Sequence, residues 1–107
     1  MARQTVVWSP EALEDVEAIA AYIARDSSFY AAAVVEKMLA AASGLSTFPG
    51  VGRIVPELGQ TDVRECFVYS YRLIYQIEET RIVVIAVVHG KRLLDDKALS
   101  SRSAKLR

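Results

Sequence analysis

Four basic or titratable side chains are expected at one end of the sheet that this sequence predicts. Arg72 lies in one strand-like segment, while His89, Lys91 and Arg92 end the next segment and begin the tail. Arginine and lysine bind phosphate oxygens, and histidine exchanges protons near neutral pH. The neighbouring Gly90 has no side chain and allows close approach to these groups. Their convergence predicts a basic site for a phosphate or a charged partner.

Each of these side chains also has an ordinary structural explanation. Arg72 could form a diagonal ion pair with Glu65 on the neighbouring strand. His89 could be half-buried and hydrogen-bonded near a strand end, and Lys91 and Arg92 could be solvated surface charges. The residues alone leave these alternatives open.

Two helices follow a short N-terminal strand in the predicted order. Residues 4–8 are strand-like, and Ser9 followed by Pro10 is typical of a helix start. Apolar residues then recur at helical spacing in two stripes, the first ending near Arg25 and the second stopping at Phe48. Ser27 or Ser28 is expected to cap the second helix, and the short loop between the two helices indicates an antiparallel helical hairpin.

Three strand-like segments follow a loop at residues 50–62. They span residues 63–68, 71–78 and 81–89, and the short gaps between them are typical of tight antiparallel hairpins. The last segment is apolar throughout its interior, as expected of a central strand covered on both faces. The fold class is therefore α+β: a short N-terminal strand, an antiparallel helical hairpin and a three-stranded antiparallel meander.

Strand alternation predicts the pairing if residues 69–70 and 79–80 form two-residue turns. In that register Arg72 lies opposite Phe67 on one side and opposite Val87 on the other. A slip of one residue in either turn would move side chains to opposite faces and change this grouping.

The same register predicts which side chains share a face. Arg72 and His89 fall together on the face that the helical hairpin does not cover. An apolar patch that includes Ile74 and Ile85 lies beside them. Arg64 falls on the opposite face, which counts against its belonging to the same site.

Composition indicates one soluble domain with no metal or cofactor. Hydrophobic residues make up 52% of the 107 residues, which is enough for a single core. The formal net charge is zero, with a small acidic excess before residue 50 and a small basic excess after it. Cys66 is the only cysteine and lies in an apolar segment, so we expect a buried thiol. One cysteine and one histidine are too few ligands for a recognisable metal site.

No signal peptide or membrane-spanning segment is recognisable, so we expect a cytoplasmic protein. We expect a single domain over residues 1–107, with a core from about residue 4 to 94 and a charged tail at 95–107.

Short motifs along most of the chain resemble the RelE/ParE superfamily of toxins from bacterial type II toxin–antitoxin modules. Each motif is weak alone, but their order and spacing are specific. They run from Val6 to about Leu94 and comprise Trp8-Ser9-Pro10-Glu11-Ala12, Tyr22-Ile23, Pro49-Gly50-Val51-Gly52-Arg53, Pro56-Glu57-Leu58, Val63-Arg64-Glu65, Tyr71-Arg72-Leu73-Ile74-Tyr75 and His89-Gly90-Lys91-Arg92.

The resemblance implies the same order of strand, two helices and meander as the residue patterns predict. It also implies a partner, a cognate antitoxin that wraps the toxin and blocks it. The apolar patch with Ile74 and Ile85 would suit an antitoxin helix or strand.

RelE-like members of this superfamily cut mRNA in the ribosomal A site without metal. Their chemistry needs cations on the phosphate and an acid and a base for proton transfer. By motif, Arg72 and Arg92 match the phosphate-contacting arginines, and His89 would be the proton-transfer group. The candidate residues for binding a nucleic acid or another target are Arg53, Arg64, Arg72, Lys91 and Arg92.

ParE-like members inhibit DNA gyrase instead. The tail at residues 93–107 lacks the tyrosine or histidine that RelE-type nucleases can carry there. The segment from His89 to Arg92, together with a well-formed helical hairpin, resembles the ParE branch more closely. We therefore favour a gyrase-directed toxin, with the ribosome and mRNA as the alternative target and an inactive partner-binding relative as a third possibility.

Overall fold

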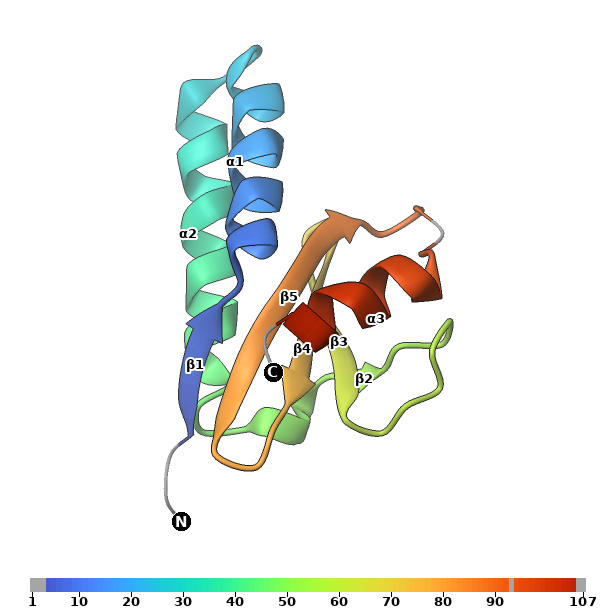
Figure 1. Cartoon of the computed structure of the whole chain (residues 1–107). Coiled ribbons are helices and arrows are strands. Elements are labelled where there is room, and N and C mark those ends of the chain that lie inside the picture. The colour runs from blue at the N-terminus through green and yellow to red at the C-terminus, as the bar shows by residue number, and fades with distance from the viewer. Residues whose placement is uncertain (1–3, 93, 106–107) are drawn as a thin grey trace.

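A helical hairpin packs on one face of a five-stranded sheet, and a C-terminal helix packs on the other (Figure 1). The computed structural model describes residues 4–92 and 94–105. The sheet order is β1-β5-β4-β3-β2, with β1 parallel to β5 and the other pairs antiparallel. The elements are β1 (Thr5–Trp8), α1 (Pro10–Ala24), α2 (Ser28–Gly44), the 3-10 turn η1 (Pro49–Val51), β2 (Arg53–Ile54), β3 (Val63–Val68), β4 (Tyr71–Ile77), β5 (Arg81–His89) and α3 (Asp96–Lys105).

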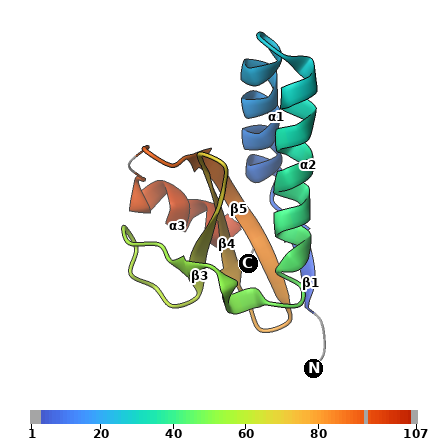
Figure 2. The ribbon, with the colours of Figure 1, turned by 180° about the vertical axis from the view of Figure 1, so that it is seen from behind.

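The far half of the helical hairpin extends beyond the end of the sheet (Figure 2). Both helices begin where the sequence predicts: the Ser9 hydroxyl accepts a hydrogen bond from the Ala12 N–H, and the Ser27 hydroxyl accepts one from the Tyr30 N–H. Helix α2 ends at Gly44 rather than at Phe48, since glycine is a poor helix former. In the described part of the chain, no helix has the length and apolar character needed to cross a membrane.

Strand β5 is covered on both faces, as predicted. The core between the sheet and the helical hairpin includes Val34, Met38, Leu45, Leu73, Tyr75 and Val84. A second core lies between the sheet, α3 and the loop before β3, and it includes Val55, Ile74, Val83, Ile85 and Leu99.

The prediction of an open apolar patch for an antitoxin is wrong. Ile74 and Ile85 are fully buried in the second core, under Leu99 of α3 and Val55 of the loop. The loop at residues 50–62 also contains η1 and the two-residue strand β2, so the sheet has one strand more than predicted. Two residues are too few to show the alternation by which strands are recognised.

A β-bulge overturns the predicted pairing between β4 and β5. The register shifts by one residue between Ile74 and Tyr75. Between this shift and the turn at residues 79–80, the residue pairs are those predicted from a two-residue turn. Beyond the shift, Arg72 pairs with Val88 instead of Val87, whereas its predicted pairing with Phe67 on β3 is confirmed.

The bulge also places His89 on the face that packs against the helical hairpin. His89 pairs with Tyr71, and the two rings meet edge to face with centroids 5.7 Å apart. The prediction that His89 shares a face with Arg72 is therefore wrong, because one inserted residue reverses the alternation beyond it.

Two distant side chains bind backbone groups of β5 at and beside the bulge. The Arg102 guanidinium on α3 donates to the Ile85 carbonyl at 2.9 Å, and the Val87 N–H donates to the Asp15 carboxylate on α1 at 3.0 Å. Arg102 and Asp15 also form an ion pair at 2.8 Å. The bulge thus connects α1, the sheet and α3.

Candidate functional site

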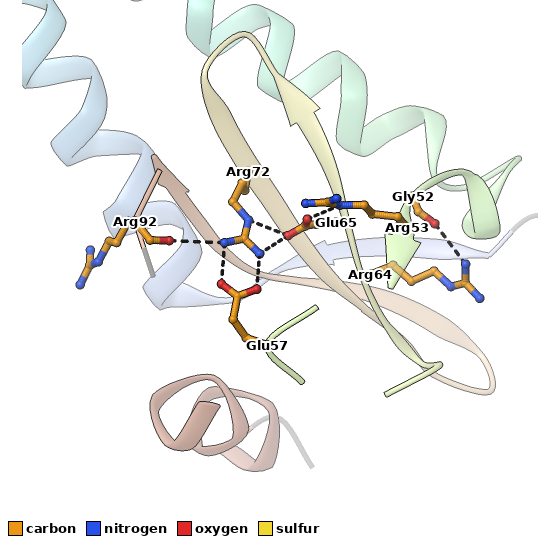
Figure 3. Close-up of polar contacts among 7 residues, drawn as sticks. All are labelled: Gly52, Arg53, Glu57, Arg64, Glu65, Arg72 and Arg92. Carbon is orange, nitrogen blue, oxygen red and sulfur yellow. Dashed lines mark hydrogen bonds and ion pairs between the residues drawn. The ribbon is translucent and has the colours of Figure 1, made fainter. Parts of the chain in front are cut away.

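Arg72 lies at the centre of a cluster of ion pairs (Figure 3). Its Nε donates to Glu65 at 2.6 Å, and its two terminal nitrogens donate to the two oxygens of Glu57 at 2.8 Å each. The terminal nitrogens also reach Glu65 and the Arg92 carbonyl. Arginine has five N–H groups. Each of them has an oxygen of this chain within reach, and Arg72 is only 4% exposed.

Glu65 connects Arg72 to a second arginine. Its carboxylate is fully buried on β3 and accepts from Arg53 at 2.6 Å as well as from Arg72. A buried carboxylate needs such partners, because leaving water costs it several kcal/mol. The ion pair between Arg72 and Glu65, one of the two explanations that the sequence left open, is thus confirmed.

Glu57 attaches the loop before β3 to this cluster. Its carboxylate forms the bidentate pair with Arg72 and accepts a hydrogen bond from the Leu94 N–H at 3.3 Å. The hydrogen bond from Arg72 lowers the pKa of Glu57 to about 2. Sequence reasoning did not assign Glu57 this role, although it lies in one of the motifs that carry the family resemblance.

Acid should weaken the Glu57 contact within a defined pH range. Since the folded pKa lies below the ordinary value of 4.5, the contact contributes its full stability above pH 4.5 and loses it as pH falls toward 2. In urea unfolding, the stability difference between the wild type and Glu57→Gln should shrink steadily across this range. A difference that does not change with pH would contradict the assignment.

Of the other predicted basic residues, only Arg53 joins Arg72, through the shared Glu65 carboxylate. Arg53 is exposed, with its guanidinium 5.3 Å from the Phe67 ring centroid. Arg64 lies on the opposite face, as the register predicts. It donates to the Gly52 carbonyl (Figure 3) and to the Thr61 carbonyl.

The segment after β5 exposes its side chains to solvent. Lys91 and Arg92 are exposed, and the Gly90 N–H donates to the Ser70 carbonyl at 2.7 Å. A Cβ atom on Gly90 would lie 2.9 Å from that oxygen, so a larger residue here would clash with the Ser70 carbonyl.

His89 is exposed rather than half-buried. Its Nδ1 accepts the Lys91 N–H at 3.2 Å, and its ring lines a hollow of about 380 Å³ with Ala18, Ile19, Tyr22 and Tyr71. Cys66 is half-buried beside the hairpin core, and burial raises the pKa of its thiol, which favours the unreactive protonated form.

The predicted site therefore separates into three parts. Arg72 and Arg53 belong to a cluster whose two carboxylates balance their charge. His89 lies on the other face of the sheet, while Lys91 and Arg92 extend into solvent. Within the described residues, the geometry around Arg72 fits a structural cluster better than a site for phosphate chemistry.

Comparison with known proteins gives the family. The family described as "ParE toxin of type II toxin-antitoxin system, parDE" matches residues 6–94. The chain therefore belongs to this family and is a type II toxin–antitoxin toxin of the RelE/ParE superfamily. A comparison with curated proteins found no match.

Three solved structures are similar to the fold. A chain of the chromosomal ParDE system from P. aeruginosa has a TM-score of 0.67 at 16% identity, covering 81% of this chain and 96% of that one. The toxin–antitoxin complex RelBE2 from Mycobacterium tuberculosis has a TM-score of 0.55 at 27% identity, covering 83% of this chain and 93% of that one. The YoeB dimer from Staphylococcus aureus has a TM-score of 0.57 at 17% identity, covering 82% of this chain and 98% of that one.

Proposed function

We propose that this chain inhibits bacterial growth by binding DNA gyrase and that a cognate antitoxin neutralises it. The family match to a ParE toxin supports the toxin role. Similarity to the RelBE2 toxin–antitoxin complex, at 27% identity, supports an antitoxin partner.

The hydrogen bonding of Arg72 is the observation that favours gyrase over mRNA as the target. A RelE-like nuclease would use this strand arginine on the scissile phosphate, yet oxygens of the chain itself surround every N–H group of the guanidinium. The only histidine lies on the opposite face of the sheet and cannot exchange protons beside Arg72. Both observations favour a toxin that acts by binding rather than by cleavage.

One observation favours the alternative target, the ribosome and its mRNA. Similarity to RelBE2 reaches 27% identity, higher than to the ParDE chain. Lys91 and Arg92 are exposed and could contact phosphates of either target. The experiments must therefore separate gyrase inhibition from mRNA cleavage.

Purified gyrase should lose supercoiling activity when the chain is added in stoichiometric excess. Reversing the exposed charges, Lys91→Glu with Arg92→Glu, should weaken inhibition by about tenfold, as expected of rim charges that guide association. Lys97→Glu, on the exposed surface of α3, is the matched control and should leave inhibition unchanged. Undiminished supercoiling at excess wild-type chain would refute the gyrase target.

Induction of the chain in growing cells tests the alternative directly. We expect a DNA-damage response and mRNA 5′ ends that are unchanged in primer extension. Codon-linked cuts that depend on translation would instead establish the RelE-like activity and reject the proposal.

A further inference from the structure

The outer edge of β3 lacks a strand partner at one end. Strand β2 pairs only with Arg64 and Glu65, so residues 66–68 extend beyond it. Val68 and Tyr71 close the two-residue turn and exchange hydrogen bonds, which directs the N–H and C=O of Phe67 away from β4. An edge of this kind can accept a further strand.

An apolar hollow adjoins this edge. It has a volume of about 320 Å³ and lies between the middle of α2 and the end of β3. The alanines on its helix side occupy little space, so a larger side chain could pack there. Its lining residues are Lys37, Ala40, Ala41, Phe67, Val68 and Tyr69.

Tyr69 has a conformation that its residue type disfavours. Its φ is 54°, in the left-handed region where glycine and asparagine are common and a bulky aromatic residue is an outlier. The side chain is nevertheless 55% exposed, with its ring centroid 6.3 Å from that of Tyr30. An exposed aromatic side chain kept at a strained turn is better explained by binding than by folding.

Charge at the hollow indicates the chemistry of the partner. Lys37 is exposed and makes no ion pair with the described residues, whereas Arg53, which lies near the Phe67 ring, is already paired with Glu65. Glu36, the neighbouring acid on α2, lines a different groove on the hairpin. The hollow therefore favours an acidic segment over a basic one.

We propose that residues 66–68 of β3 and the adjoining hollow bind an extended, acidic segment of the cognate antitoxin. The segment pairs with the backbone of Phe67, places one apolar side chain over Ala40 and Ala41, and directs a carboxylate toward Lys37. This proposal rests on the antitoxin partner of the proposed function and names where and in which conformation that partner binds.

Amide hydrogen exchange of the full-length chain tests the backbone pairing. The probe is the purified cognate antitoxin, added at saturating concentration. The Phe67 amide should exchange at least about tenfold more slowly in the complex than in the free chain, as expected when an open amide gains a hydrogen-bond partner. An unchanged rate in the complex would overturn the proposal. So would protection in the free chain that grows with concentration, which would indicate a second copy as the occupant.

Substitutions test the side-chain contacts. Tyr69→Asn removes the aromatic ring and relieves the turn, so it should raise the melting temperature while weakening antitoxin binding by about tenfold. Lys37→Glu should also weaken binding. Phe29→Ala, at an exposed aromatic residue in the first turn of α2, and Lys97→Glu are the matched controls and should bind as the wild type does.

The outcomes separate the two proposals. If the wild type binds the antitoxin and Tyr69→Asn and Lys37→Glu bind it equally well, the proposed docking site is overturned. The toxin–antitoxin function then remains intact. No binding of the antitoxin to the wild type overturns both. Because Tyr69→Asn is expected to stabilise the fold, weaker binding by that variant cannot be attributed to unfolding.

Discussion

Replacing Arg72 with methionine should destabilise the fold by about 3–5 kcal/mol, the usual cost of breaking a buried ion pair by removing one partner. Methionine can occupy the space of the aliphatic stem but supplies no N–H groups. Glu65 is fully buried and would retain only Arg53, and Glu57 would lose its bidentate partner. Urea unfolding followed by circular dichroism measures the loss.

Two further variants isolate the cause of that loss. Arg25→Met removes an exposed arginine at the end of α1 and should change stability by no more than about 0.5 kcal/mol. Adding Glu57→Gln and Glu65→Gln to Arg72→Met removes the unpaired charges and should recover part of the stability. Should Arg72→Met lose no more than Arg25→Met, the cluster would not be structural, and Arg72 would again be a candidate for phosphate binding.

The sequence predicted local structure well because the signals are local. Ser9 and Ser27 cap the two helices of the hairpin as expected, and β3 and β5 span the residues that their apolar patterns predict. The ion pair between Arg72 and Glu65 could also be predicted, since both lie close together across one two-residue turn.

The site was harder to predict, because a bulge leaves no mark in an apolar strand. Ile85 lies in a run of seven apolar residues, and none of them differs in a way that identifies the inserted one. That single insertion reverses the face of His89 relative to Arg72. The groups that stabilise the bulge, Asp15 and Arg102, are 87 residues apart and could not be paired from sequence.

Glu57 shows a second limit of sequence patterns. It comes from a loop with no periodicity, so nothing in the pattern indicates that it folds back onto β4. Its pairing turns Arg72 from a candidate phosphate ligand into the centre of a structural cluster. The same loop supplies β2, and the buried Gly52 directly precedes that strand.

Replacing Gly52 with alanine should destabilise the fold by about 1–3 kcal/mol, the range typical of overpacking a tight site. A Cβ atom there would lie 2.5 Å from the Glu65 carbonyl oxygen and 2.7 Å from the Tyr75 hydroxyl. The Gly52 N–H donates to that hydroxyl at 2.9 Å, and the hydroxyl donates to the Pro49 carbonyl at 2.7 Å. Relieving the clash would therefore strain both hydrogen bonds of a fully buried tyrosine.

Gly50→Ala is the matched control for this substitution. A Cβ atom on Gly50 meets nothing within 4 Å, so its urea unfolding should match that of the wild type within about 0.5 kcal/mol. Equal effects of the two substitutions would contradict the steric explanation. Since Gly52 directly precedes Arg53, which donates to Glu65, the Gly52 variant should also weaken the ion-pair cluster. Combined with Arg72→Met, Gly52→Ala should then cost less than the sum of the two separate losses.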